Sequence, residues 1–199
     1  MSDPLELAAR LGRDYLAALP DRAVSPTPAA IARLAELRTP LPDGPSDAAA
    51  VLASLDAIGS PATMASAGGR FFGFVTGASL PVAVGASWLA TAWDQNAALA
   101  AMSPIAVALE RVVLEWLREL LALPDGVTGA LVTGATMGNF TALAAARRSV
   151  LARVGWNVDD DGLFGAPPIT VVVGEEVHVS LVKALGLLGL GRARVVRVP

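Results

Sequence analysis

The chain has 199 residues, a formal net charge of −3 and no cysteine. A slightly acidic chain lacks the broad basic surface typical of nucleic-acid-binding proteins, and without cysteine it forms neither disulfides nor thiolate metal sites. We therefore expect no nucleic-acid partner and no metal site. Its length fits one domain with a substantial core or a part of a larger domain.

The first 60 residues are predicted to form helices. Two helices begin where a capping side chain precedes a proline, at Asp3 and at Thr27, and Ser46 is expected to open a third helix that ends near residue 59. The first helix carries a single apolar stripe, formed by Leu5, Leu7, Leu11, Tyr15, Leu16 and Leu19. This stripe must be buried, either within its own domain or against another subunit.

Residues 71–93 form an uncharged stretch long enough to span a bilayer. Gly73, Pro81 and several hydroxyl side chains interrupt it, however, so a buried loop and a helix packed on a partner subunit fit better than a membrane span. The amino terminus has no basic segment followed by an apolar one, as a signal peptide would. We expect a cytoplasmic protein that does not interact with membranes.

Ser103 and Pro104 start a long amphipathic helix that ends before a turn at residues 124–126. One face is expected to pack on a core, and it is formed by Ile105, Leu109, Val112, Val113, Trp116, Leu117 and Leu120. Glu110 and the other charged residues are assigned to the solvated face, where we expect no catalysis.

Strand and helix then alternate. Strands are predicted at residues 130–133, 169–173 and 193–198, with helices at 137–154 and 179–188 between them. This β-α-β order indicates an α/β fold with a parallel sheet.

The turn between the first of these strands and its helix is Gly134-Ala135-Thr136. Small residues let the backbone approach an anion closely, the first N–H groups of the helix are free to bind a phosphate, and the Thr136 hydroxyl adds a donor. Simple helix capping is the alternative explanation for such a turn.

His178, the single histidine of the chain, follows the second predicted strand. The carboxyl ends of parallel strands meet at one edge of a sheet, so His178 and the turn at 134–136 are expected to lie close together. A phosphate site beside an aromatic ring suggests a cofactor that is both a phosphate ester and a flat ring. A solitary histidine can equally be a structural residue.

Several motifs occur in one order along residues 65 to 195, and together they are far more specific than any one of them. They are Arg70-Phe71-Phe72-Gly73-Phe74, Ser103-Pro104 with Glu110 and Trp116, Gly129 to Asn139, Arg147, and His178-Val179-Ser180 with Lys183-Ala184. In these the chain resembles the amino-terminal part of the group II pyridoxal-phosphate-dependent amino-acid decarboxylases, which include the aromatic-L-amino-acid and glutamate decarboxylases. The resemblance implies an incomplete fold-type I large domain at residues 61–199, after a helical segment at 1–60 that packs in the dimer.

The resemblance also implies roles for individual residues. Ala135 and Thr136 would hold the phosphate of pyridoxal 5'-phosphate, and His178 would be the catalytic residue that stacks on its ring. Phe72 would line the substrate pocket, although an aromatic core cluster is an equally good interpretation and Gly68-Gly69 replaces the His-Pro usual in the family. Asn139 is expected to brace the phosphate loop.

The function implied is decarboxylation of an amino acid by a homodimeric full-length relative. The lysine of the family that binds the cofactor, in a His-Lys pair, and the aspartate that pairs with the pyridine nitrogen both lie beyond Pro199. Lys183 is not expected to replace that lysine, because it follows His178 by five residues on one helix and the two groups must approach opposite faces of the ring. We expect it to be a surface residue and the chain alone to be inactive.

Other functions remain open from the sequence. The chain could belong to another enzyme with this cofactor fold, such as an aminotransferase or a carbon–carbon lyase. It could also be a truncated, non-catalytic remnant or a dimerising module. The residues do not indicate which amino acid is the substrate, because much of the specificity pocket lies outside them.

Overall fold

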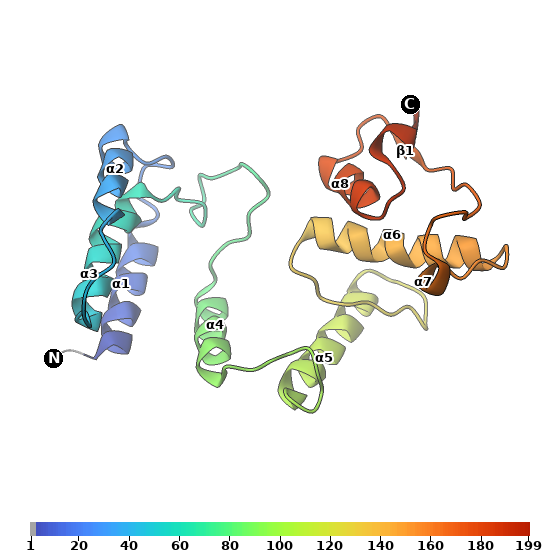
Figure 1. Cartoon of the computed structure of the whole chain (residues 1–199). Coiled ribbons are helices and arrows are strands. Elements are labelled where there is room, and N and C mark those ends of the chain that lie inside the picture. Colours follow the sequence, from blue (N-terminus) through green and yellow to red (C-terminus); the bar gives the residue numbers. More distant parts are fainter. Residues whose placement is uncertain (1–2) are drawn as a thin grey trace. The chain divides into compact units, whose positions relative to one another are not determined.

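The structure is a computed structural model that describes residues 3–199. The chain divides into two compact units, Met1–Asp94 and Gln95–Pro199, which are considered separately (Figure 1). The boundary expected near residue 60, between an amino-terminal helical segment and the large domain, stays a prediction. No helix in the described part of the chain is both long enough and apolar enough to cross a membrane.

The first unit is helical. Its α-helices are α1 (Pro4–Ala18), α2 (Pro28–Arg33), α3 (Ala48–Gly59) and α4 (Pro81–Trp93), with short 3-10 turns η1 (Leu34–Leu37) and η2 (Ser60–Ala62).

The predicted helix starts are confirmed at two of three positions. The Asp3 carboxylate accepts the Leu5 N–H at 2.8 Å, and the Thr27 hydroxyl accepts the Ala30 N–H at 3.2 Å. The third cap is Asp47, since its carboxylate accepts the Ala50 N–H at 3.1 Å, and the prediction of Ser46 was wrong by one residue. Both residue types cap helices well, so the pattern alone did not separate these neighbours.

Helix α1 packs against α3 in this unit. Of the predicted apolar stripe, Leu7 and Leu19 are buried, whereas Leu5 is 70% exposed. The guanidinium of Arg22 lies over the Tyr15 ring, 4.7 Å from its centroid, and Arg70 donates to the Pro20 carbonyl at 2.8 Å. The Arg70 contact anchors the start of the aromatic loop at residues 70–74 to the segment that follows α1.

The uncharged stretch after that loop forms helix α4, which exposes much of its apolar surface. Val82, Leu89 and Trp93 are 78%, 54% and 47% exposed. The expectation that this helix packs on a partner subunit stays a prediction.

The second unit contains both helices and strands. Its elements are α5 (Pro104–Leu120), α6 (Ala135–Ala152), α7 (Val158–Asp161), β1 (Val172–Gly174), α8 (Val179–Leu187), the 3-10 turn η3 (Arg192–Arg194) and β2 (Val196–Val198).

Strands β1 and β2 pair in parallel, with Val172 opposite Val196, and α8 connects them (Figure 1). Helix α6 lies against α8, and this pair forms the centre of the unit. Leu151 of α6 and Ala184 and Leu185 of α8 are at most 1% exposed. The predicted β-α-β order at residues 169–198 is therefore present, although the strands are shorter than expected.

The strand predicted at residues 130–133 is absent, and the segment is irregular. A strand needs a neighbour to accept its backbone hydrogen bonds, whereas the Leu131 N–H donates to a side chain, Glu110 Oε1 of α5, at 3.0 Å. Glu110 was expected to lie on the solvated face only. It also makes a structural contact, because it accepts this hydrogen bond.

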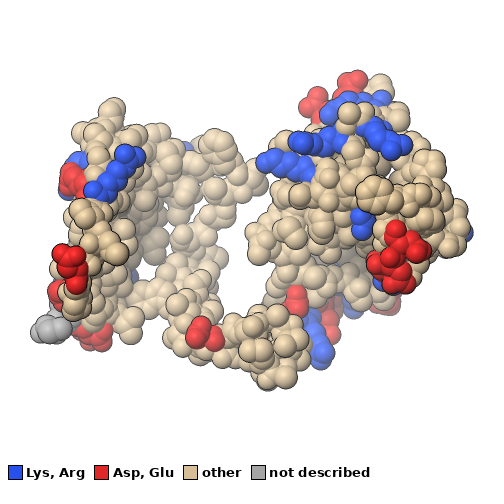
Figure 2. Space-filling view, viewed as in Figure 1, with Lys and Arg blue, Asp and Glu red and all other residues tan. Residues whose placement is uncertain are grey.

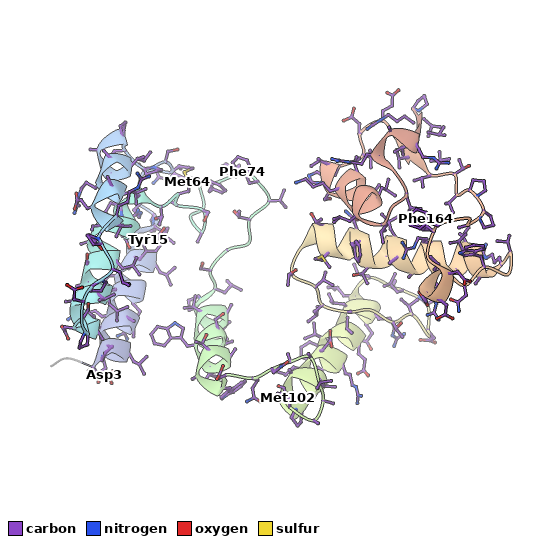
Figure 3. All side chains as sticks on the ribbon, viewed as in Figure 1. Asp3, Tyr15, Met64, Phe74, Met102 and Phe164 are labelled. Atoms are coloured by element: carbon purple, nitrogen blue, oxygen red, sulfur yellow. The ribbon has the colours of Figure 1, made fainter. Side chains whose placement is uncertain are left out.

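The apolar face of α5 is also more open than predicted, because Trp116 is 66% and Leu120 is 81% exposed. Elsewhere in the chain, Phe74 and Phe164 project from the ribbon with 92% and 99% of their surface exposed (Figure 3). Each unit therefore presents large apolar side chains to its surroundings.

Candidate functional site

Helix α6 begins at Ala135 with no side-chain cap among the described residues. Its first turn closes when the Gly138 N–H donates to the Gly134 carbonyl at 3.0 Å. The N–H groups of Ala135 and Thr136 precede that bond, so the helix directs them outward as donors. A Cβ added to Gly134 would meet no atom within 4 Å, which means that the space beside this turn is open. An uncapped, open helix start of this kind suits a phosphate group.

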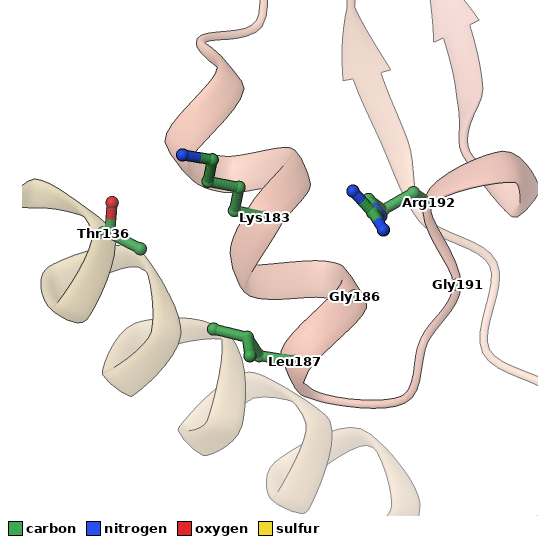
Figure 4. A pocket seen from close by; sticks show the side chains of 6 residues that line it. All are labelled: Thr136, Lys183, Gly186, Leu187, Gly191 and Arg192. Carbon is green, nitrogen blue, oxygen red and sulfur yellow. The ribbon is translucent and has the colours of Figure 1, made fainter.

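A pocket of about 550 Å³ lies beside this first turn (Figure 4). Its lining residues are Thr136 of α6, Lys183, Gly186 and Leu187 of α8, and Gly191 and Arg192 of the following turn. Lys183 and Arg192 are exposed, and no ion pair is formed by either within residues 3–199. Two cationic side chains near the start of a helix give this pocket a positive potential that favours anions.

Basic side chains gather on the same part of the unit in Figure 2. The exposed basic residues of α8 and the segment that follows it are Lys183, Arg192, Arg194 and Arg197. Basic side chains therefore continue beyond the pocket towards β2, where the exposed Glu175 and Glu176 also lie.

His178 is the N-terminal cap of α8. Its Nδ1 accepts the Ser180 N–H at 3.2 Å and lies 2.8 Å from the Ser180 hydroxyl oxygen. That hydroxyl also accepts a hydrogen bond from Asn139 Nδ2 of α6 at 2.9 Å. Hydrogen bonds therefore connect the second turn of α6 to the first turn of α8 and its capping histidine.

Arg147 makes a second connection between these helices. Its Nη1 donates to the Leu188 carbonyl, at the end of α8, at 2.9 Å. A cationic group at a helix C-terminus satisfies a free carbonyl and interacts favourably with the helix dipole. The two helices are thus joined near both ends of α8, with Ala184 and Leu185 buried between these connections.

The structure brings together three of the four site residues taken from the sequence. Ala135 and Thr136 lie on the first turn of α6, and His178 lies at the start of α8, which packs on it. Phe72 belongs to the other unit, where it is 94% exposed, so its role in a substrate pocket stays a prediction. Lys183 is exposed as expected, but it shares a pocket with Thr136, which the sequence did not suggest.

Two features of the site escaped the sequence analysis. Ser180, 6% exposed, links His178 to the rest of the site, and the signal available was its position two residues after a capping histidine. The second is the hydrogen bond from Asn139 to Ser180 on the neighbouring helix, while the expectation that Asn139 braces the phosphate loop stays a prediction. The described residues contain no cluster of three or more possible metal ligands.

The structure is similar to solved structures of larger proteins. It matches mouse CSAD in its apo form with a TM-score of 0.83 and 20% identity, and Oryza sativa TDC with PLP and tryptamine with a TM-score of 0.84 and 23% identity. Each match covers 98% of this chain and 41% of the other. Likeness at this identity establishes the fold, and it confirms the predicted fold-type I large domain, of which this chain is one part.

Sequence comparisons agree with these matches. The chain is 30% identical over 136 residues to an aromatic-L-amino-acid decarboxylase of Bacillus atrophaeus, covering 65% of this chain and 25% of that protein. It is 28% identical over 116 residues to an L-2,4-diaminobutyrate decarboxylase of Acinetobacter baumannii, covering 54% and 21%. The chain thus spans about a quarter of the length of these relatives.

A family model described as the pyridoxal-dependent decarboxylase conserved domain matches residues 32–199. This match confirms the resemblance drawn from the motifs, and pyridoxal 5'-phosphate is the cofactor of that family. The chain belongs to the pyridoxal-dependent decarboxylase family.

Proposed function

We propose that the protein containing this chain decarboxylates an amino acid with the help of pyridoxal 5'-phosphate. The observation that carries the proposal is the pairing of α6, whose start is open and uncapped, with α8, which begins at the single histidine. Family membership supports the same chemistry. The cofactor, when bound, accepts the electron pair that is left when the carboxylate departs as carbon dioxide.

In this proposal the start of α6 binds the phosphate end of the cofactor. The Ala135 and Thr136 N–H groups and the Thr136 hydroxyl donate to phosphate oxygens, and the helix dipole adds to the attraction. Lys183 and Arg192 contribute positive potential from the adjoining pocket. These donors hold one end of the cofactor still, and a fixed position lowers the entropic cost of the reaction.

His178 contacts the other end of the cofactor. We propose that the flat face of its imidazole lies against the pyridine ring, so that the ring cannot turn about the phosphate anchor. The start of α8 is a suitable place for this contact, because buried packing against α6 fixes the position of the helix.

We further propose that the 199-residue chain alone does not turn over substrate. Lys183 is its single lysine, and it lines the pocket beside Thr136 on the phosphate side of the site. From there it would not approach the face of the ring opposite His178, where the covalently bound lysine is required. Release of carbon dioxide from an amino acid by the purified 199-residue chain would contradict this proposal.

The active form is proposed to be a homodimer. Helix α4 exposes Val82 and Trp93, and α5 exposes Trp116 and Leu120. Apolar surfaces of this extent are typical of faces that another chain or domain covers. Phe72, in the loop before α4, is proposed to contact the substrate in that assembled form.

The test is a product assay with the intact protein, pyridoxal 5'-phosphate and a panel of amino acids. We expect carbon dioxide and the matching amine. Exchanging Thr136 for valine should weaken cofactor binding roughly tenfold or more, as for loss of one hydrogen bond to a charged group. The matched control is Thr141→Val at an exposed position of the same helix. A keto acid as product would favour an aminotransferase, and an inactive protein that binds no cofactor would favour a non-catalytic module.

A further inference from the structure

The Ser180 hydroxyl of α8 has a hydrogen-bond partner on each side, Asn139 of α6 and His178, and the three side chains form a line of hydrogen bonds. Asn139 Nδ2 donates to this hydroxyl from α6 at 2.9 Å, and the hydroxyl oxygen lies 2.8 Å from Nδ1 of His178. Ser180 is 6% exposed, so water has little access to compete for these bonds. A buried hydroxyl with two partners is held in one rotamer, and it holds its partners in turn.

The direction of these hydrogen bonds follows from a fourth group, the backbone N–H of Ser180. It donates to His178 Nδ1 at 3.2 Å, so that nitrogen is an acceptor and carries no proton. With its oxygen accepting from Asn139, the Ser180 hydroxyl is free to donate its proton to Nδ1, where it would share the single lone pair of that nitrogen with the backbone N–H. Every donor in the line therefore points towards the imidazole, and the ring proton is on Nε2.

We propose that Ser180 and Asn139 are positioning residues that fix the ring plane and the Nε2–H tautomer of His178. The reason for such positioning rests on the proposed function, since a ring that stacks on a cofactor must keep its orientation. The hydrogen bonds themselves are present whether or not that function is correct. In the line as it stands, His178 presents a fixed Nε2–H donor on the side of the ring away from Ser180.

Nuclear magnetic resonance of the imidazole nitrogens tests this proposal directly. The chain contains a single histidine, so one pair of ring nitrogens gives the whole signal. Measured on the 199-residue chain without cofactor, under alkaline conditions where imidazoles are neutral, the parent protein should show Nε2–H as the major tautomer and Nδ1–H as a small fraction.

Two substitutions should change the tautomer ratio in a graded way. Ser180→Ala removes one of the two donors to Nδ1, and it should raise the Nδ1–H fraction about fivefold, as for one hydrogen bond of ordinary strength. Asn139→Asp should raise it further and make Nδ1–H the major form. A carboxylate accepts the hydroxyl proton, which turns the Ser180 oxygen into an acceptor for Nδ1–H.

The controls separate positioning from general damage to the fold. Ser180→Thr keeps the hydroxyl, and Ser149→Ala removes an exposed serine from the same helix as Asn139, so both should give the parent spectrum. Parent-like spectra for both Ser180→Ala and Asn139→Asp would overturn the proposal, because the backbone N–H alone would then set the tautomer. If Ser180→Ala does not fold, an unchanged ratio in Asn139→Asp overturns it. A shift in Ser149→Ala would also contradict it.

The outcome is independent of the cofactor. A graded tautomer shift in a protein that fails to bind pyridoxal 5'-phosphate would leave the positioning role intact and contradict the proposed function. Cofactor binding and decarboxylation, together with unchanged tautomer ratios in the variants, would support the proposed function and contradict the positioning role.

Discussion

Leu185 offers the clearest test of the packing that carries the site. Its side chain is 0% exposed on α8, the helix that packs against α6. Truncating a fully buried leucine to alanine removes its transfer free energy and leaves a cavity, and together these cost about 2–5 kcal/mol. Because Leu185 is fully buried, we expect a loss near the middle of this range, about 3 kcal/mol, for Leu185→Ala.

Urea unfolding followed by circular dichroism measures this loss. With a slope of about 2 kcal/mol per molar urea, a loss of about 3 kcal/mol lowers the midpoint by ~1.5 M. Leu187→Ala is the matched control, because Leu187 is on the same helix and 68% exposed, and it should change stability by less than about 0.5 kcal/mol. Equal midpoints for the two variants would refute the reasoning, since they would show that α8 does not pack through Leu185.

Three further substitutions test individual contacts. Asp47→Ala should destabilise α3 by about 1 kcal/mol in urea unfolding, whereas Ser46→Ala should have no effect; the opposite order would move the cap to Ser46. Arg147→Ala should cost about 1.5–3 kcal/mol by removing its bond to the end of α8, and Arg148→Ala, which breaks an exposed ion pair, less than about 1 kcal/mol. Lys183→Met should weaken cofactor binding by the intact protein severalfold at low salt and much less at high salt, and a salt-independent effect would exclude an electrostatic role.

Local signals in the sequence were sufficient for most of the helices. Asp3 and Thr27 each place a side-chain acceptor before a proline, and both cap helices in the structure. The alternation after residue 169 likewise gives a strand, a helix and a second strand in the predicted order. These features depend on neighbouring residues, which a sequence displays directly.

Features that depend on distant partners were harder to predict. Residues 130–133 have a strand composition, but the Leu131 N–H bonds to a side chain on α5 and not to another strand. The apolar face of α5 was assigned to a core, yet Trp116 is 66% exposed. The pattern specifies that a face is apolar, and it does not specify which surface covers it.

In the candidate site, too, features set by neighbouring residues were predictable and features set by distant partners were not. The turn at Gly134 and the single histidine were recognisable because each has an unusual local composition. The line from Asn139 through Ser180 to His178 joins residues 41 and two positions apart, and nothing in their spacing indicates it. Contacts of this kind arise from the packing of α6 on α8 and are visible only once that packing is known.

The measurement that tests the central claim most directly is a crystal structure of the intact protein with pyridoxal 5'-phosphate. The account predicts phosphate oxygens within hydrogen-bond distance of the Ala135 and Thr136 N–H groups, and the His178 imidazole stacked on the pyridine ring. A cofactor bound with its phosphate away from the start of α6, or with its ring out of contact with His178, would contradict it.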